Sequence, residues 1–360
     1  MTTNLKEYNT IDPFKISFSN IQSVTRSMKA IQISEYVKGP SDLVVKDIPD
    51  PVPGDHDLLI EIHSSATNFF DILQIQGKYQ TQPPFPWVAG FEFAGIVLSA
   101  PSDSQWKKGD RVFGGSQGSY AEKLVVPDVP GTLLPIPADW SFVDACGLFV
   151  TAPTSYLALT TRANLKKGEI CLVHAAAGGV GLAAVQIAKA LGATVIATAG
   201  TKEKLEIAKK YGADHGVNYT DKDWIQQVKD LTDGEGCDVI YDPVGMVDQS
   251  LKVVAWNGRI CVIGFAAGKI EKIAMNKALL KQCSIVGVFW GGNAMRRPME
   301  VPGVWKGLLT MMEKKQLKPT VFSKVFQGLD GVAPALEALG SRGTWGKVVI
   351  NVKKDKTGKL

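Results

Sequence analysis

The sequence predicts an α/β protein with two domains, in which a doubly wound parallel sheet of six strands is inserted into a β-rich domain. Short apolar runs alternate with helical patterns between about residues 165 and 292. Residues 28 to about 150 instead carry short strand patterns rich in Val, Ile, Pro and Gly. A glycine cluster opens the first helical pattern of the alternating region, which is where a doubly wound sheet places its ligand.

The alternating region contains six strand patterns and five helical patterns. The apolar runs that predict strands are residues 169–175, 194–199, 215–219, 237–242, 258–265 and 284–290. The segments with helical spacing are residues 181–192, 202–212, 221–232, 247–256 and 275–282. Two of these helices end in a glycine, Gly192 and Gly212, as helix C-termini prefer. Strict alternation of this kind predicts parallel strands joined by helices.

The flanking segments predict a second, β-rich domain. Its strand patterns before the insertion are residues 29–34, 57–66, 93–100, 110–115 and 121–127. After the insertion, residues 301–316 predict an amphipathic helix and residues 344–352 a closing strand. We therefore assign residues 28–150 and 301–360 to one domain and residues 151–300 to the other. Residues 1–27, rich in Ser, Thr and Asn, are interpreted as a poorly ordered extension.

Charge is spread along the chain rather than gathered in one region. The chain has 40 Lys and Arg against 35 Asp and Glu, a formal net charge of +5. The two signs alternate except in the last ten positions, so we expect no nucleic-acid partner, which would need a concentrated basic patch. The cysteines stand mostly inside apolar runs and are predicted to be free thiols in a reducing compartment: Cys146, Cys171, Cys237, Cys261 and Cys283.

Two segments bear on localisation. Residues 1–27 lack the apolar core of a signal peptide, so a cytoplasmic location is expected. Residues 15–29 contain no acidic side chain, which leaves a mitochondrial location open, and the terminal Gly-Lys-Leu resembles a peroxisomal address only loosely. Residues 170–188 carry no Asp, Glu, Lys or Arg, but their glycine cluster and strand pattern argue against a membrane span.

Residues 174–181 read HAAAGGVG and lie between a predicted strand and a predicted helix. Small residues at this place let backbone N–H groups approach a pyrophosphate, and the N-terminus of the helix adds a favourable dipole. Against the spacing G-x-G-x-x-G, the positions are Ala176, Gly178 and Gly181, so alanine replaces the first glycine. In the context of six alternating units, this loop predicts a dinucleotide site.

The cofactor is predicted to be NADP(H) rather than NAD(H). The end of the second strand reads ATAGTKEK and has no carboxylate at the position that would bind the ribose 2′-hydroxyl. Thr201, Lys202 and Lys204 can instead donate to a 2′-phosphate. From these residues alone, a second interpretation stays open, in which the lysines only form a solvated start of the next helix.

Several motifs together resemble a known family. Seven segments between Met28 and Val352 resemble the quinone oxidoreductase (zeta-crystallin-like) branch of the zinc-independent medium-chain dehydrogenase/reductase superfamily: AAAGGVGLAAVQIAKALGATVIATAGT, NFFDILQIQGKY, VAGFEFAGIV, GDRVFG, GSYAEKLVVP, CDVIYDPVG and FWGG. The resemblance implies a GroES-like catalytic domain and a Rossmann domain that binds NADP(H). It also implies a homodimer.

The resemblance further implies cofactor contacts, position by position. Similar enzymes hold the 2′-phosphate with a glycine, a lysine and a tyrosine, which match Gly200, Lys204 and Tyr219, and often with an arginine, which matches Arg342. Thr154 matches a threonine that contacts the nicotinamide amide. The glycine-rich loop, its neighbourhood and the loops around the nicotinamide complete the set: Ala177, Gly178, Gly179, Val180, Gly181, Thr201, Gly264, Phe265, Phe289, Trp290 and Gly291.

The chemistry is predicted to need no metal. The chain has no Cys before Cys146 and only two histidines there, and Phe91 replaces the histidine of the Gly-His-Glu motif found in zinc enzymes of the superfamily. Without a Lewis acid, the substrate must already be electrophilic, as quinones and enones are. Asn68 and Tyr79 match polar residues of the substrate cleft and are candidate donors to a developing oxyanion. A tyrosine that some relatives use is Leu73 here.

The sequence thus predicts an NADPH-dependent reductase of small quinones or other α,β-unsaturated carbonyls, with one- or two-electron transfer left open. An enoyl-thioester reductase is the alternative within enzymes, because Arg296 and Arg297 can bind the phosphates of coenzyme A. A non-catalytic NADPH-binding protein, structural or RNA-binding, is the alternative of another class. The run SIVGVFWGG predicts an apolar sheet edge that a homodimer would cover.

Overall fold

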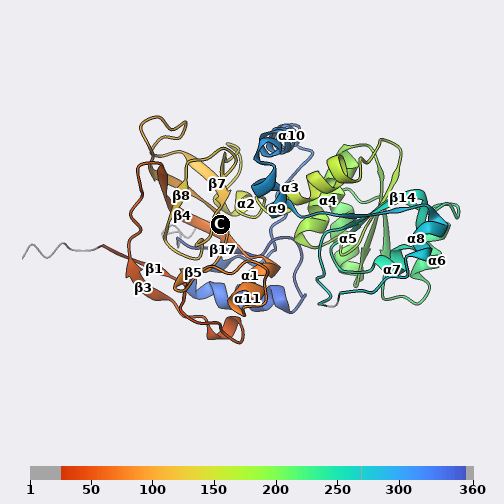
Figure 1. Ribbon diagram of the computed structural model, residues 1–360, viewed down its shortest axis with the longest axis horizontal. Coiled ribbons are helices and arrows are strands. Elements are labelled where there is room, and N and C mark those ends of the chain that lie inside the picture. The colour runs from red at the N-terminus through yellow and green to blue at the C-terminus, as the bar shows by residue number, and fades with distance from the viewer. Residues whose placement is uncertain (1–25, 269, 354–360) are drawn as a thin grey trace, which may run out of the picture.

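Two lobes, each built around one large β-sheet, make up the protein (Figure 1). This computed structural model describes residues 26–268 and 270–353. Nearly all of the extension predicted at residues 1–27 lies outside this range. A six-stranded sheet forms one lobe and a seven-stranded sheet the other, as the sequence predicts for a doubly wound and a β-rich domain. The division of the chain near residues 150 and 300 stays a prediction.

The six-stranded sheet is parallel throughout, and its order is β12-β11-β10-β13-β14-β15. Its strands are β10 (Ile170–Val173), β11 (Thr194–Ala199), β12 (His215–Asn218), β13 (Cys237–Asp242), β14 (Val254–Val262) and β15 (Ser284–Gly287). The chain reverses its direction of travel through the sheet between β10 and β13. A crevice at this switch point, beyond the carboxyl ends of the strands, is the usual ligand site of such folds.

Helices cover both faces of this sheet, as its doubly wound topology requires. The helices are α4 (Gly179–Ala190), α5 (Lys202–Lys210), α6 (Trp224–Asp230), α7 (Val247–Ser250), α8 (Asn276–Lys281) and α9 (Trp290–Arg296). Side chains of α4 and α5 share one core with β10 and β11, whereas those of α6, α7 and α8 share another. The two faces of the sheet therefore pack against two different layers of helices.

Two predicted elements differ from the structure. The helix predicted at residues 247–256 ends at Ser250, and Val254 already belongs to β14, where it pairs with Cys237 of β13. The β-branched pair Val253 and Val254 is better suited to a strand, and the sheet supplies the partner that a local helical pattern cannot show. The strand predicted at residues 284–290 is shorter in the structure, where β15 ends at Gly287 and Trp290 begins helix α9.

The other lobe has a seven-stranded sheet. Six of its strands pair in the order β16-β17-β4-β6-β7-β9, and the seventh, β8, pairs with β4. Two short pairs, β1 with β3 and β2 with β5, adjoin it. The strands are β1 (Ser27–Ala30), β2 (Gln32–Ile33), β3 (Lys46–Pro49), β4 (Asp57–Ala66), β5 (Trp87–Val88), β6 (Glu92–Ser99), β7 (Arg111–Gly115), β8 (Lys123–Pro127), β9 (Leu133–Pro135), β16 (Phe326–Gln327) and β17 (Val349–Asn351). The closing strand β17 pairs with β4, so the chain end completes the sheet that its first half began.

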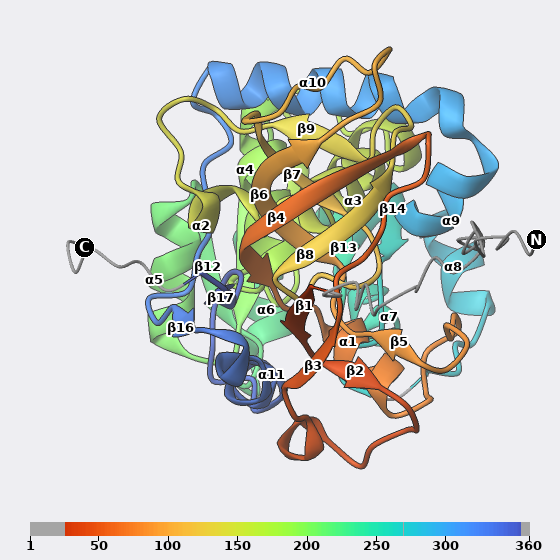
Figure 2. The same ribbon diagram turned by 90° about the vertical axis from the view of Figure 1, so that its left-hand side faces the viewer.

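Helices also connect and cover this lobe. They are α1 (Phe69–Ile75), α2 (Phe142–Ala145), α3 (Thr151–Tyr156) with its continuation η2 (Leu157–Arg162), α10 (Val301–Glu313) and α11 (Val332–Gly340). Short turns complete the list: η1 (Pro40–Asp42), η3 (Pro298–Glu300) and η4 (Leu329–Gly331). Helix α10 runs along one side of the molecule above β9 and α3 (Figure 2). Its Trp305 contacts Phe113 of β7 and Phe149 and lies in a core that also includes Val173 of β10.

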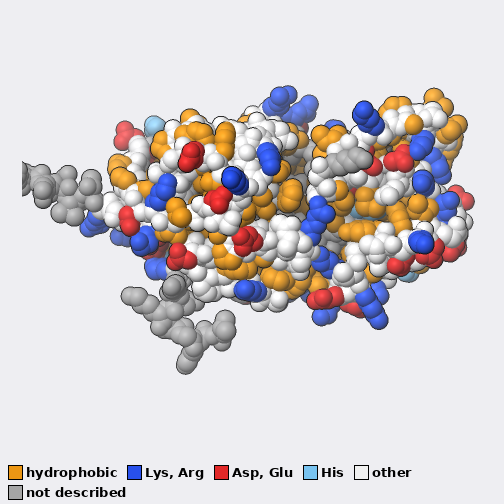
Figure 3. Space-filling model, turned by 90° about the horizontal axis from the view of Figure 1, so that it is seen from below, with side chains coloured by type: hydrophobic (Ala, Val, Ile, Leu, Met, Phe, Trp, Pro, Cys, Tyr) orange, Lys and Arg blue, Asp and Glu red, His pale blue; other side chains and the backbone are white. Residues whose placement is uncertain are grey.

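The structure confirms that the cysteines are unpaired, as predicted. All five are free thiols, four of them buried and Cys283 partly so. Residues 170–188 divide into β10, a glycine-rich turn and α4. Within residues 26–268 and 270–353, no helix combines the length and apolarity that crossing a membrane requires. On the face shown in Figure 3, acidic and basic side chains are interspersed.

Candidate active site

The glycine-rich loop lies at the switch point of the parallel sheet. Ala176 N–H donates to Thr198 C=O of β11, and Gly178 N–H donates to Ala175 C=O in a tight turn. Gly178 is the N-cap of α4, so Gly179, Val180 and Gly181 are the first residues of this helix. The N–H groups of these first residues have no carbonyl acceptor within the helix, because no helical turn precedes them. The loop therefore presents an N-terminal anion site of the kind that binds a pyrophosphate.

Two glycines of the loop differ in how closely the protein packs around them. A Cβ at Gly181 would lie 2.4 Å from Ala175 C=O, so only glycine lets α4 approach the turn this closely. A Cβ at Gly178 would meet one atom, Ala175 C=O at 3.3 Å, and the backbone there is extended. The protein itself tolerates a side chain at Gly178 more readily.

The residues predicted to hold a 2′-phosphate come together at the end of β11. Lys204 Nζ donates to Arg342 C=O at 2.6 Å, and Arg342 Nη2 donates to Ala266 C=O at 2.9 Å. The Tyr219 ring lies beside Gly200, where a Cβ would be 3.5 Å from it. Partial burial lowers the pKa of Lys204 and raises that of Tyr219. Residues more than 130 positions apart thus form one polar, cationic corner.

Helix α5 begins at this corner. Its N-cap is Thr201, whose hydroxyl accepts from Lys204 N–H at 3.3 Å. This capping bond orients the first turn, so that Lys204 lies towards Arg342 while Lys202 is exposed. The two lysines of this turn are therefore placed differently, and only Lys204 contacts the segment of Arg342.

The residues predicted to hold the nicotinamide come from three further segments: α3, the loop after β14 and the segment after β15. Thr154 on α3 is half-buried, and its hydroxyl donates to Val150 C=O at 2.6 Å. The loop after β14 contains Gly264 and Phe265 and packs on the loop after β13 through Ala266 N–H to Pro243 C=O. Phe265 is 41% exposed and therefore accessible to a ligand.

The residues after β15 divide in their exposure. Phe289 is 62% exposed, whereas the Trp290 side chain is 8% exposed and packs in the core. The Phe289 ring lies close to Gly291: a Cβ on Gly291 would be 3.5 Å from Cε2 of this ring. Phe289 and the backbone of Gly291, rather than the indole of Trp290, are therefore the parts of this segment that a cofactor could contact.

The predicted oxyanion donors differ in their availability. Tyr79 stacks on Phe70 with ring centroids 5.4 Å apart, and burial and nearby Asp71 raise its pKa. No residue in the described part of the chain hydrogen-bonds its hydroxyl, which is thus available to a ligand. Asn68 is buried, and its amide Nδ2 donates to Glu92 at 2.8 Å while its Oδ1 accepts from Lys347 at 2.8 Å. One N–H of this amide remains for other partners.

A buried ion pair lies directly behind Asn68. Lys347 Nζ contacts Glu92 Oε2 at 2.6 Å, and both side chains are nearly inaccessible to solvent, at 5% and 0% exposure. The same ammonium donates to Thr67 C=O at 2.8 Å. Glu92 Oε1 accepts from Val150 N–H at 2.6 Å. The ion pair therefore connects the N-cap of α1 with the residue that accepts from Thr154.

A second buried carboxylate lies on α1. Asp71 is 1% exposed, and its Oδ2 accepts from the Tyr120 hydroxyl at 2.7 Å and from Asn68 N–H at 2.8 Å. Its Oδ1 is buried without a hydrogen-bond partner. Desolvation raises the pKa of this carboxyl to about 7, although the two hydrogen bonds oppose the shift. The hydrogen bonds of Asp71 cap α1, which carries Phe70 and leads to Tyr79.

Comparisons with known proteins agree on the family. Residues 54–138 match the alcohol dehydrogenase GroES-like domain, and residues 179–311 match the zinc-binding dehydrogenase domain. The chain is 39% identical over 336 residues to quinone oxidoreductase-like protein 2 homolog of Nematostella vectensis, which covers 91% of this chain and 90% of that protein. The chain belongs to the quinone oxidoreductase-like family of medium-chain dehydrogenases/reductases. The lobe with the seven-stranded sheet is therefore the GroES-like domain, and the lobe with the six-stranded parallel sheet is the Rossmann domain.

Solved structures of this family have the same fold. The quinone oxidoreductase of Pseudomonas syringae pv. tomato DC3000 superposes with a TM-score of 0.80 at 32% identity and covers 90% of this chain and 99% of its own. The Escherichia coli quinone oxidoreductase, whose structure is a complex with NADPH, superposes with a TM-score of 0.80 at 28% identity over 90% and 99%.

The name of the matched Rossmann-type domain implies zinc, but the residues present do not fit a zinc site. In residues 26–268 and 270–353 no three His, Cys, Asp or Glu side chains are grouped so that they could bind a metal. At the position of the zinc-ligand motif, Phe91 packs against Phe70 and Phe149 in an aromatic cluster. His63 instead contacts Glu61 and stacks on Phe142. We derive no chemical step through a metal in this member of the quinone oxidoreductase-like family.

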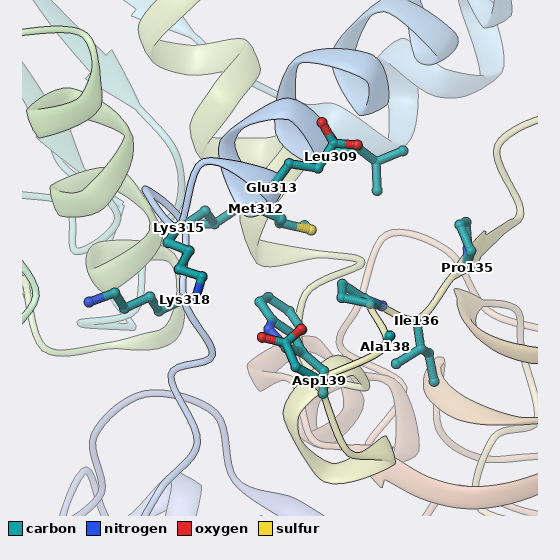
Figure 4. A pocket seen from close by; sticks show the side chains of 12 residues that line it. Pro135, Ile136, Ala138, Asp139, Leu309, Met312, Glu313, Lys315 and Lys318 are labelled. Carbon is teal, nitrogen blue, oxygen red and sulfur yellow. The ribbon is translucent and has the colours of Figure 1, made fainter.

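Two cavities lie away from this site. One of about 570 Å³ lies between α10 and the segment after β9 (Figure 4), and Asp139, Glu313 and Lys315 are among its lining residues. The other, of about 660 Å³, is lined by the C-terminal ends of α4 and α5 and by Trp345. None of the predicted site residues lines either cavity. These cavities are therefore separate from the predicted cofactor and substrate residues.

Sequence reasoning missed the two charged residues behind Asn68. Glu92 stands alone in the apolar run FEFAGIV, and Lys347 stands alone in WGKVVI. An isolated carboxylate just before the predicted strand 93–100 and an isolated ammonium in the predicted strand 344–352 are a usable signal, because buried charges must find opposite partners. Their pairing across 255 residues could not be read from local spacing.

Proposed function

We propose that this protein is an NADPH-dependent reductase that transfers hydride to quinones or other α,β-unsaturated carbonyl compounds. The observation that carries the proposal is the cationic corner of Lys204, Arg342, Tyr219 and Gly200 beside the N-terminus of α4. A dianionic 2′-phosphate fits this corner, and the pyrophosphate fits the helix terminus. The NADPH in the E. coli quinone oxidoreductase structure supports the same cofactor for this chain.

Each part of the site has a proposed task. NADPH, when bound, supplies a hydride from C4 of its nicotinamide ring. Thr154, Gly264 and Phe265, together with Phe289 and Gly291, hold the nicotinamide end, and the glycine-rich loop holds the phosphates. The Tyr79 hydroxyl donates to the oxygen on which charge develops, because its pKa is raised and it keeps its proton at neutral pH. The remaining N–H of Asn68 is the second donor to the same oxygen.

The first experiment compares NADPH and NADH oxidation by the purified protein. The acceptors are benzoquinone, phenanthrenequinone, a simple enone and crotonyl-coenzyme A. We expect turnover of a quinone or the enone, with NADPH preferred. Turnover of the thioester alone would instead make the protein an enoyl-thioester reductase. NADPH binding without any turnover would contradict the proposed activity and favour a non-catalytic role.

The cofactor assignment has a matched pair of variants on one helix. Lys204→Ala removes a charge-assisted hydrogen bond of about 1.5–3 kcal/mol, so the KM for NADPH should rise about 10- to 100-fold while that for NADH stays unchanged. Lys202→Ala removes an exposed lysine two residues away and should change neither value. Equal KM values for NADPH in wild type and Lys204→Ala would overturn the assignment of the 2′-phosphate site.

We also propose that two copies pair through the Rossmann sheet edge. Strand β15 ends the six-stranded sheet, and helix α8, which precedes it in the chain, carries Leu279 at 76% and Leu280 at 67% exposure. Such an edge is an aggregation hazard unless covered. Light scattering should give the mass of two chains, and Leu280→Lys should shift it towards one. Val52→Lys, an exposed apolar position on the other lobe, is the control. A monomeric wild type would contradict the proposal.

A further inference from the structure

The ion pair of Lys347 and Glu92 is built more completely than a structural contact requires. The ammonium has three N–H groups, and each has an acceptor: Glu92, Asn68 Oδ1 and Thr67 C=O. Glu92 in turn accepts from Val150 N–H and Asn68 Nδ2 besides Lys347. A buried pair with every polar atom satisfied is held in one geometry, because any displacement breaks several bonds at once.

Lys347 reaches this position along a path that two glycines leave open. A Cβ at Gly147 would lie 2.8 Å from Lys347 Cβ, and one at Gly179 would lie 3.0 Å from Lys347 Cδ. Gly179 is the first residue of α4, so the lysine stem lies against the helix that is proposed to bind the pyrophosphate. Gly346, the residue before Lys347, donates its N–H to Ala177 C=O of the glycine-rich loop at 2.7 Å.

The pair therefore contacts three parts of the proposed site. Through Gly179 and Gly346, the lysine is placed against the cofactor loop. Through Asn68, the pair holds the start of α1 and the cleft. Through Val150, whose C=O accepts from Thr154, it holds the start of α3. Because all three ammonium protons are already donated, Lys347 cannot also donate to a cofactor phosphate.

We propose that Lys347 and Glu92 are positioning residues that set the placement of the nicotinamide relative to the substrate cleft. This inference rests on the proposed function. Neither side chain touches substrate or cofactor. They act through Asn68 and through Val150 with Thr154, while the phosphates and the 2′-phosphate corner bind independently of them.

The main test uses the double variant Lys347→Met/Glu92→Gln. It removes both charges together and leaves no unpaired buried ion, so the fold should survive. We expect the Kd for NADPH to stay within threefold of wild type. The fluorescence enhancement of the bound nicotinamide should fall at least twofold, and kcat should fall at least 30-fold. Arg259→Met/Glu169→Gln, which removes a partly buried pair of the Rossmann domain away from the loop, is the matched control and should leave all three unchanged.

A second variant keeps the charges and moves the lysine. Gly147→Ala pushes the Lys347 stem, whereas Gly303→Ala adds a methyl on α10 where no atom lies within 4 Å. Gly147→Ala should reproduce the loss of nicotinamide fluorescence and of kcat, and Gly303→Ala should not. This variant decides the question if the double variant does not fold.

The outcomes separate this inference from the proposed function. Wild type that binds NADPH but reduces none of the acceptors would contradict the function, and the fluorescence of the variants would still test the positioning. Wild-type turnover with unchanged fluorescence and kcat in Gly147→Ala and in the folded double variant would overturn the positioning role alone.

Discussion

At the scale of single residues, two glycines of the cofactor loop separate folding from binding. Gly181→Ala would place a methyl 2.4 Å from Ala175 C=O, so the free energy of unfolding should fall by about 1–3 kcal/mol. Gly178→Ala meets one atom at 3.3 Å and has an ordinary extended backbone, so stability should change little. Its methyl would, however, enter the space proposed for the pyrophosphate, and NADPH affinity should fall at least tenfold.

Urea unfolding and NADPH titration of both glycine variants check this prediction. The reverse pattern, an unstable Gly178→Ala and a stable Gly181→Ala, would contradict the assigned packing of the loop.

Two buried titratable residues should give stability opposite dependences on pH. Burial between Thr198 and Ser250 lowers the pKa of His174 from 6.5 to about 4, so the unfolded chain binds its proton first and stability falls as pH drops from about 6.5 to 4. Burial raises the pKa of Asp71 from 3.8 to about 7, so the folded chain holds the proton and stability falls as pH rises through this range. The two contributions oppose each other between pH 4 and 6.5.

Asp71→Asn removes one of these contributions and keeps the shape of the protonated carboxyl. Relative to wild type, the free energy of unfolding of this variant should therefore rise by about 2 kcal/mol between pH 5 and 6.5. Urea midpoints at several pH values measure the difference. A difference that does not change with pH would mean that Asp71 is not protonated in the folded protein.

At the scale of elements, one large side chain packs helix α10 onto the β-rich lobe. Trp305 is 2% exposed and packs against Phe113 and Phe149. Trp305→Ala should lower the free energy of unfolding by about 3–5 kcal/mol, because removing a large buried aromatic side chain leaves a cavity in the core. Lys306→Ala, one residue along and exposed, is the control. Chemical denaturation measures both, and a loss below about 1 kcal/mol for Trp305→Ala would show that α10 does not depend on this contact.

Elements also show where local patterns succeed and fail. The glycine-rich loop and α4 follow from the apolar run, the small residues and the helical spacing that succeed one another along the chain. The helix predicted at residues 247–256 was wrong after Ser250, because Val254 pairs with β13 and a sheet partner outweighs helical spacing. Likewise, Trp290 was predicted to belong to the strand at residues 284–290 but begins helix α9.

At the scale of the whole molecule, the two lobes share a core. Phe113 of β7, Ala152 of α3 and Val173 of β10 belong to one cluster of buried residues. Because neither lobe can lose this cluster without exposing apolar surface of the other, we expect a single thermal transition, with far-UV circular dichroism and Trp fluorescence changing together. Two calorimetric transitions would contradict this expectation.

The parallel sheet, the glycine-rich loop and the run that places Lys204 beyond β11 could be predicted from the sequence, because each depends on periodicity or spacing within a few residues. The pairing of Lys347 with Glu92 depended on the folded structure, whereas Arg342 had been assigned to the corner of Lys204 through the family resemblance. This ion pair joins residues 255 positions apart, and no local pattern encodes which distant side chain will neutralise a buried charge. The need for a partner is visible in the sequence, but its identity is decided by the packing of the two lobes.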